Sequence, residues 1–264
     1  QGVKIFYIHY SYISAINASL IARLSGAKTF YWSCGMMWLF GKDKALGLVL
    51  KLINHLVTGV EALKSGYIEH YGISADKVKI MPNWIDLNRF NNIDINLIYK
   101  KYSLNNTDQY LLFVHRLAKR KGAHYIARLA KSNPEFKFLI AGDGPYKEQL
   151  VKEITDLNNV ILLGKVPNQD VPSLMKISKL FFMPSEEEGF PRVLLESMAA
   201  GLPYVAFDIG GVREISTKEQ QEYIVDNVNN MDLAIKNILN NTDMYDKLIQ
   251  INLEHVKQFD IKVV

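Results

Sequence analysis

Short hydrophobic runs alternate with segments of helical periodicity along the whole chain. The hydrophobic runs are four to six residues long and lie at 4–8, 29–32, 56–59, 78–81, 111–114, 136–141, 160–163, 180–183 and 204–207. Apolar positions at helical spacing occupy 15–24, 44–53, 61–71, 123–131, 146–157, 171–177, 192–200 and 231–239. Strands that are apolar throughout and alternate with helices are typical of a parallel sheet covered on both faces. The pattern therefore predicts an α/β fold built from doubly wound, Rossmann-like parallel sheets.

The least regular stretch, residues 83–109, separates two such α/β units. It is rich in Asn and Asp and holds only a short helical segment at 95–101. We predict a first domain at residues 1–98 and a second at residues 99–264. The second has enough strands for a complete doubly wound domain, whereas the first has about four against the roughly six of a full Rossmann sheet. We therefore expect the start of the N-terminal domain to be absent from this sequence.

A glutamate-rich loop leads into a helix in the sequence EEEGFPRVLLESMAAG, residues 186–201. Pro191 suits the first turn of a helix, because that position needs no free N–H. Glu188 then lies on the loop before the helix N-terminus, and Glu196 lies about one turn inside the helix. A helix N-terminus favours an anion such as a diphosphate, while two carboxylates suit the hydroxyl groups of a sugar and a ribose. The pattern predicts a nucleotide-sugar site, although either glutamate taken alone would usually be a solvated surface acid.

A cluster of cations follows the strand at 111–114, in the sequence HRLAKRKGAHY. Cations at the carboxyl end of a parallel strand suit a phosphate clamp, because ligands of open α/β sheets bind at that edge. We assign this role to Arg116 and Lys121. We interpret Lys119 and Arg120 as solvated residues of a basic turn.

Three further residues near strand ends are candidates for the site, but each could instead have a purely structural role. Gly142, in AGDGPYKEQL, permits a tight turn before a helix, so this turn is either a phosphate loop or a purely structural βα turn. His9 ends the first strand, and a catalytic or sugar-contacting role weighs evenly against a structural one. Asn83 follows the strand at 78–81 and either faces the same edge or belongs to a simple turn.

Composition narrows the function classes only a little. The net charge of +4 is too small to indicate nucleic-acid binding, so we expect no nucleic-acid partner. The single cysteine, Cys34, excludes an intrachain disulfide and indicates a reducing, cytoplasmic compartment. No apolar run reaches transmembrane length. The aromatic segment 30–40 most simply packs in the core, but an exposed 36–40 would suit peripheral contact with the inner face of a membrane or with a lipid acceptor.

Together these motifs resemble the GT-B glycosyltransferases, in particular the retaining family 4 type, over nearly the whole chain. The similarity is strongest at 109–215, where residues 188–215 look like the nucleotide-sugar motif of that family. The segment PNWIDLNRF is similar to the family's Pro-Asn-Gly-Val-Asp border motif, with Trp84 in place of the usual Gly. The segment KIFYIHYSY resembles a strand whose terminal His contacts the donor sugar. The resemblance implies two Rossmann-like GT-B domains, of which the N-terminal one is incomplete here.

The resemblance also implies a role for each matching residue. Glu188 would approach the donor sugar, Glu196 would hold the ribose, and Arg116 and Lys121 would grip the diphosphate. His9 would contact the donor sugar as a further catalytic residue. The remaining donor-binding positions are the loop Gly189, Phe190 and Pro191, together with Asn83, Gly142 and Val166.

The sequence thus predicts a retaining glycosyltransferase of hexosyl type. It would move a sugar from an NDP-sugar to a glycan or lipid-linked acceptor in cell-surface polysaccharide or glycolipid synthesis. The sequence holds no Asp-rich metal site and no pyridoxal lysine motif, so we expect no cofactor, no obligatory metal ion and no phosphorylase activity. The alternative is a non-catalytic sugar-nucleotide-binding subunit or an inactive fragment, because the family's Gly-rich loop near the start of the N-terminal domain has no counterpart here.

Overall fold

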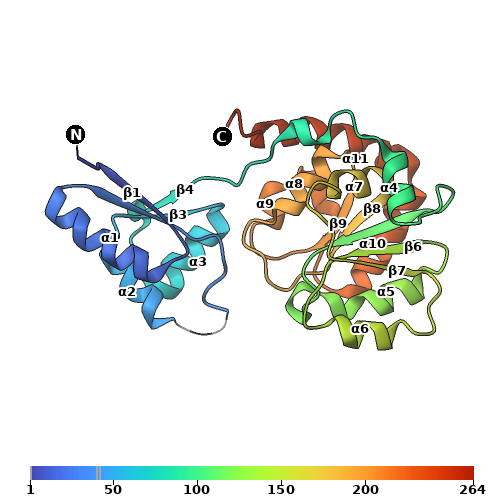
Figure 1. The fold of residues 1–264 in the computed structure, drawn as a ribbon, viewed down its shortest axis with the longest axis horizontal. Coiled ribbons are helices and arrows are strands. Elements are labelled where there is room, and N and C mark those ends of the chain that lie inside the picture. The colour runs from blue at the N-terminus through green and yellow to red at the C-terminus, as the bar shows by residue number, and fades with distance from the viewer. Residues whose placement is uncertain (1, 40, 42) are drawn as a thin grey trace. The chain divides into compact units, whose positions relative to one another are not determined.

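The computed structural model describes residues 2–39, 41 and 43–264, which form two α/β units (Figure 1). The first unit extends to residue 83 and includes 188–190, and the second holds 84–187 and 191–264. Each unit contains one parallel sheet, of four strands in the first and six in the second. The predicted fold class of two parallel-sheet α/β domains is therefore confirmed.

The division between the units lies before the predicted border at 98/99. Two short helices, η2 (Leu87–Phe90) and α4 (Ile95–Lys101), pack against α7 (Val171–Ile177) of the second unit. Ile85 N–H donates to Phe259 O at 2.9 Å, and Tyr102 Oη donates to the Asp170 carboxylate at 2.7 Å. These contacts attach the Asn-rich segment to the second unit, and composition does not reveal them.

In the first unit the strands follow one another across the sheet in chain order. They are β1 (Ile5–His9), β2 (Lys28–Trp32), β3 (His55–Thr58) and β4 (Val78–Ile80), and the connecting helices are α1 (Tyr12–Ser25), α2 (Lys44–Leu52), α3 (Glu61–Tyr71) and η1 (Ala75–Lys77). The Asp43 carboxylate caps α2 by accepting from Ala45 N–H and Leu46 N–H, and Gly26 ends α1 with a left-handed φ of 70°. Apolar side chains of these helices and strands form the unit's core.

The second unit is a doubly wound sheet in the strand order β10-β9-β8-β5-β6-β7. Its strands are β5 (Tyr110–Val114), β6 (Lys137–Ala141), β7 (Val160–Gly164), β8 (Ser178–Met183), β9 (Tyr204–Phe207) and β10 (Ile224–Val225). Beside α4 and α7, its helices are η3 (Lys119–Lys121), η4 (Ala123–Tyr125), α5 (Ile126–Ser132), α6 (Lys147–Glu153), α8 (Arg192–Ala199), α9 (Val212–Ile215), η5 (Gln220–Tyr223), α10 (Val228–Asn240), α11 (Thr242–His255) and η6 (Val256–Phe259). Helices α5, α6 and α10 cover one face of the sheet, and α7, α8 and α11 cover the other (Figure 1).

All nine predicted strands are present, and β10, α9 and α11 are additional elements. Because every strand pairing of the second sheet is parallel, the carboxyl ends of β5, β6, β7 and β8 lie at one edge. The loops that carry Arg116, Gly142, Val166 and Glu188 leave the sheet at this edge. None of the described helices is both long and apolar enough to cross a membrane.

Candidate functional site

The loop after β8 is held by the basic turn that follows β5. Glu186 N–H donates to Arg120 O at 3.0 Å, the Arg120 guanidinium lies 3.0 Å from the Glu187 carboxylate, and Lys121 Nζ donates to Glu187 O. Gly122 makes the approach close: its φ is 75°, and a Cβ there would lie 2.1 Å from Pro184 O. Arg120 is exposed, as predicted for a solvated residue of a basic turn, and its guanidinium also pairs with the Glu187 carboxylate of the glutamate loop.

Residues 188–190 of that loop belong to the first unit. Asn83 Nδ2 donates to Phe190 O at 3.2 Å, and a Cβ on Gly189 would lie 1.6 Å from Cys34 O. Glu188 is buried, with 8% of its surface exposed. Backbone packing therefore requires the glycine of the Glu-Gly-Phe-Pro motif, while contacts of Glu188, Gly189 and Phe190 with a donor stay predictions.

Helix α8 begins just after Pro191, which is its N-cap and not a first-turn residue as predicted. Pro191 makes no side-chain capping hydrogen bond, so the first N–H groups of α8 are left for water or a ligand. Such N–H groups, together with the helix dipole, favour an anion at this end of the helix.

Glu196 lies about one turn inside α8, with its side chain 15% exposed. Arg89, from η2, places Nη1 at 3.7 Å from Glu196 Oε1 and donates from Nη2 to Asn168 O at 2.8 Å. Burial raises the pKa of the Glu196 carboxyl, and the positive charges of Arg89 and Arg192 oppose that rise. The ionised carboxylate thus has little contact with water, and hydrogen bonds from hydroxyl groups would stabilise it.

A hollow of about 210 Å³ opens at the carboxyl ends of β5, β6 and β7. It gathers three of the predicted residues, Arg116, Gly142 and Val166, from three successive βα loops. The turns around it are tightly packed, because a Cβ on Gly142 would lie 1.9 Å from His115 O. Asn168, whose carbonyl accepts from Arg89, also lines this hollow, which we call the βα pocket. Glu196 is connected to the βα pocket through Arg89.

Two charged residues of the βα pocket were not predicted from the sequence. Lys165 lines it beside Arg116, and Asp143 lies at its rim, 3.1 Å from Lys147 Nζ. Lys147 and the Gly144 N–H lower the pKa of the Asp143 carboxyl, which therefore stays ionised. Arg89 was not predicted either. It lies in PNWIDLNRF, a segment already identified from the sequence, so its position in that segment could have suggested a role.

His9 lies at the carboxyl end of β1 and is exposed. Its ring stacks on Trp32 with centroids 5.6 Å apart and meets Tyr7 edge-on at 5.2 Å. These aromatic contacts orient the imidazole, but they do not test a catalytic role, which stays a prediction.

The aromatic segment after β2 packs mainly in the first unit, as its default interpretation holds. Met37 and Trp38 contact the core, and the Trp38 ring stacks on His70 at 5.2 Å. Leu39 is 43% exposed, and Phe40 lies outside the described residues. Within residues 2–39, 41 and 43–264, no three His, Cys, Asp or Glu side chains converge on a potential metal site.

Comparison with known proteins shows which family the sequence resembles. Residues 94–255 match the family model described as "Glycosyl transferases group 1". The chain is 27% identical over 229 residues to the N-acetyl-alpha-D-glucosaminyl L-malate synthase of Bacillus anthracis, covering 81% of this chain and 59% of that protein. It is 31% identical over 189 residues to the UDP-Gal:alpha-D-GlcNAc-diphosphoundecaprenol alpha-1,3-galactosyltransferase of Escherichia coli, covering 66% and 47%. The chain thus spans about half the length of these relatives.

A solved structure shares the fold of the whole chain. Anabaena Alr3699/HepE, crystallised in complex with UDP and glucose, superposes with a TM-score of 0.84 at 22% identity, covering 98% of this chain and 75% of that one. At this level of identity the likeness concerns the fold.

Proposed function

The chain belongs to the glycosyl transferases group 1 family, and from that membership we propose that it transfers a sugar from a nucleoside diphosphate sugar to a glycan or lipid-linked acceptor. The Escherichia coli relative is named as a galactosyltransferase that uses UDP-Gal and a diphosphoundecaprenol-linked sugar, and one solved neighbour was crystallised with UDP and glucose. We extend these properties to this chain as a proposal, with a role in cell-surface polysaccharide or glycolipid synthesis at the cytoplasmic side of the membrane.

One observation carries the proposal. The βα pocket gathers Arg116, Gly142 and Val166 at the carboxyl edge of a doubly wound sheet, and Arg89 joins its wall to Glu196. Nucleotides bind at this edge in open α/β sheets. Arg116 supplies a guanidinium for phosphate oxygens, and a buried carboxylate suits the two hydroxyls of a ribose.

In the proposed reaction, the bond between the anomeric carbon and the diphosphate oxygen breaks, an acceptor hydroxyl oxygen bonds to that carbon, and the hydroxyl proton passes to the departing diphosphate. Arg116, Lys121 and the N-terminus of α8 would stabilise the charge that develops on the departing diphosphate. Glu188 and His9 would contact the donor sugar. Retention of configuration would follow from attack on the same face within an ion pair, with no covalent enzyme intermediate and no obligatory metal ion.

A second function, nucleotide-sugar binding without transfer, is favoured by one specific observation. All residues of the βα pocket, and also Arg89 and Glu196, belong to the second unit. Phosphate and ribose binding by these residues would therefore depend on the second unit alone, which suits a binding subunit. The two functions differ in turnover, because only an enzyme would consume the donor.

Calorimetric titration with UDP, GDP and ADP tests the donor site. We expect one nucleotide to bind with a dissociation constant near micromolar, roughly −8 kcal/mol. Glu196→Ala should weaken that binding by about tenfold or more, because it removes a charged acceptor, which is worth about 1.5–3 kcal/mol. Glu135→Ala, an exposed glutamate just before β6, is the matched control and should bind like the parent.

Slow donor hydrolysis in the absence of acceptor would support transfer, whereas tight binding without turnover would support the binding subunit. If none of the nucleotides binds to the folded chain, the donor site and the proposed function both fail.

A further inference from the structure

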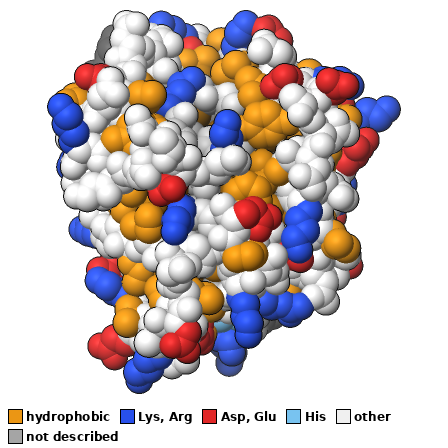
Figure 2. All heavy atoms as spheres, turned by 90° about the vertical axis from the view of Figure 1, so that its right-hand side faces the viewer, with side chains coloured by type: hydrophobic (Ala, Val, Ile, Leu, Met, Phe, Trp, Pro, Cys, Tyr) orange, Lys and Arg blue, Asp and Glu red, His pale blue; other side chains and the backbone are white. Residues whose placement is uncertain are grey.

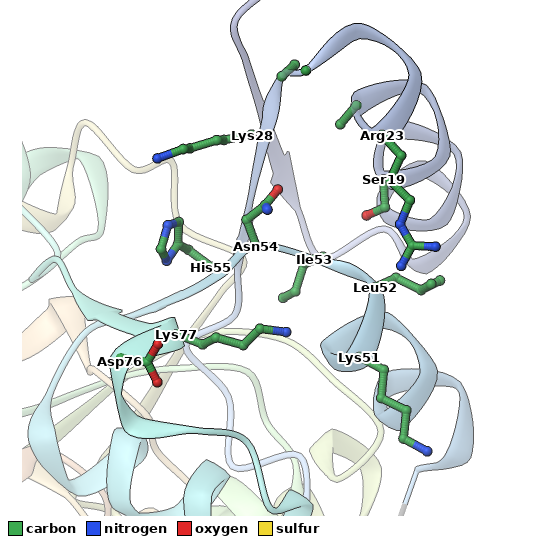
Figure 3. A pocket seen from close by; sticks show the side chains of 13 residues that line it. Ser19, Arg23, Lys28, Lys51, Leu52, Ile53, Asn54, His55, Asp76 and Lys77 are labelled. Atoms are coloured by element: carbon green, nitrogen blue, oxygen red, sulfur yellow. The ribbon is translucent and has the colours of Figure 1, made fainter.

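A second cavity, separate from the βα pocket, opens in the first unit. It lies at the amino ends of that unit's strands, whereas the βα pocket lies at the carboxyl ends of the second unit's strands. The second cavity has a volume of about 660 Å³, and it lies between the last turns of α1 and α2, the starts of β2 and β3, and η1 (Figure 3). Volumes of roughly 300–1,000 Å³ are typical of small-molecule sites. We call this cavity the basic pocket.

Positive charge dominates the basic pocket. Arg23, Lys28, Lys51 and Lys77 line it, against the single carboxylate of Asp76. Within the described residues none of the four cations makes an ion pair. By contrast, acidic and basic side chains are interspersed over the face of the molecule that Figure 2 shows.

The ends of two helices account for only part of this charge. Arg23 and Lys51 lie in the last turns of α1 and α2, where the helix dipole contributes about half a negative charge each. Two half charges and Asp76 together amount to about two negative charges, against four positive ones. Lys28 and Lys77 belong to neither helix, so their charges are not explained by the dipoles.

One of these cations, Lys28, acts on the neighbouring imidazole of His55, which also lines the pocket. The pKa of His55 is lowered, first by burial and then by the charges of Lys79 and Lys28, while Asp76 acts in the opposite direction. Its Nδ1 is buried and has no hydrogen-bond partner among the described residues. Lys28 therefore adds positive charge on the side of the pocket where His55 lies.

A buried hydroxyl on the other side of the pocket is also without a partner. Ser19, on α1, is 2% exposed, and its Oγ makes no hydrogen bond within the described residues. Figure 3 shows this hydroxyl and the Arg23 guanidinium reaching from α1, and the Lys77 ammonium reaching from the opposite side, toward the space beside Ile53. Buried polar groups are normally hydrogen-bonded, so an orphaned one facing a cavity indicates a missing ligand or water.

We propose that the basic pocket binds the phosphate group of a phosphorylated molecule. The Arg23 guanidinium would bind two phosphate oxygens as a fork, Lys77 would supply a second charge, and the Ser19 hydroxyl would donate to a third oxygen. Leu52 and Ile53 line the pocket beside these groups and leave room for an organic portion. Such a phosphate has two sources, a soluble phosphorylated compound and the headgroup of an anionic lipid.

Proton NMR of the His55 ring tests the proposal, because this ring reports on the basic pocket and not on the donor site. Inorganic diphosphate is added to the full chain, and the His55 signal is identified by its loss in His55→Asn. We expect a saturable change in the signal and a rise in the pKa of His55, since a bound anion offsets the charges of Lys28 and Lys79.

Variants locate the binding groups. Arg23→Ala combined with Lys77→Ala should weaken binding at His55 by at least about tenfold, and Ser19→Ala by a few fold. Lys131→Ala combined with Lys152→Ala removes two exposed cations of the second unit and should change nothing. Circular dichroism checks that each variant is folded. A His55 signal that ignores diphosphate, or an affinity in the Arg23/Lys77 variant within twofold of the parent, overturns the proposal.

Flotation with vesicles separates the two sources. Phosphatidylcholine vesicles with and without phosphatidic acid are compared, using the parent and the Arg23/Lys77 variant. Binding that requires both phosphatidic acid and the two cations assigns the phosphate to a lipid. Diphosphate binding at His55 without vesicle binding assigns it to a soluble compound. Vesicle binding that is equal in both proteins, without a response of His55, rejects the site.

Discussion

At the scale of single residues, Glu196 and Arg89 decide how the donor site responds to its surroundings. Burial disfavours the charged form of Glu196, and Arg89 offsets part of that penalty while also bonding to Asn168 O. The carboxylate and the βα pocket wall are thus linked by one guanidinium. Changes in charge at either residue should be visible in nucleotide binding.

The raised pKa of Glu196 predicts that nucleotide binding weakens in acid. Ribose hydroxyls donate to the ionised carboxylate, so binding requires the deprotonated form. Below the raised pKa the proton must first be lost, and affinity should fall by up to about tenfold per pH unit. Above it, affinity should be flat. Calorimetry between neutral and mildly acidic pH measures this, and Glu196→Gln should bind more weakly but without the same pH dependence. If the parent and Glu196→Gln lose affinity in acid to the same extent, Glu196 is not the group whose protonation weakens binding.

Replacing Arg89 should move that pH dependence. Without its positive charge the pKa of Glu196 rises further, so in Arg89→Ala the loss of binding should begin at higher pH. The lost bond to Asn168 O should also lower neutral-pH affinity, by about tenfold. Arg89→Lys keeps the charge but not the two-pronged contact, and should restore the pH profile more than the affinity. Arg128→Ala, an exposed arginine on α5, is the control. An Arg89→Ala variant with weaker binding but an unmoved pH profile would mean that Arg89 acts on the loop alone.

At the scale of elements, tight βα turns place the pocket residues. Gly142 follows β6, and Gly164 is the last residue of β7. Only Gly142 lacks room for a side chain, because a Cβ there would lie 1.9 Å from His115 O. A Cβ on Gly164 would have no neighbouring atom within 4 Å. Gly164→Ala should cost about 1–2 kcal/mol for its left-handed φ of 67°. Gly142→Ala should lower the free energy of unfolding more, by about 3 kcal/mol, because the backbone must shift. Chemical denaturation of both variants measures the difference, and equal losses would contradict the steric argument.

The elements themselves could largely be predicted from periodicity. Strands such as 111–114 and 180–183 are apolar throughout, and this pattern alone separates them from the amphipathic helices. Short elements without such a pattern were not predicted. One example is β10 (Ile224–Val225), which has only two residues. The turn containing Arg120 and the segment containing Arg89 could not be predicted in detail, because their partners, Glu187 and Asn168, lie 67 and 79 residues away in the sequence.

At the scale of the whole molecule, the predicted site residues are divided between the two units. The βα pocket, Arg89 and Glu196 lie in the second unit, whereas His9, Asn83 and residues 188–190 lie in the first. The second unit also has its own extensive apolar core. Nucleotide recognition and sugar contact are therefore expected to depend on different units.

This division predicts that a chain starting at residue 84 binds the same nucleotide as the full chain. Its affinity should stay within about threefold, because every proposed ligand of the phosphates and ribose is retained, while donor turnover should be lost with His9. Circular dichroism and calorimetry measure folding and binding. Arg116→Ala in the shortened chain is the control and should abolish most of the binding, since the guanidinium is a proposed phosphate ligand. A folded shortened chain that binds no nucleotide would show that residues 1–83 are needed to complete the nucleotide site, and the division of roles would be wrong.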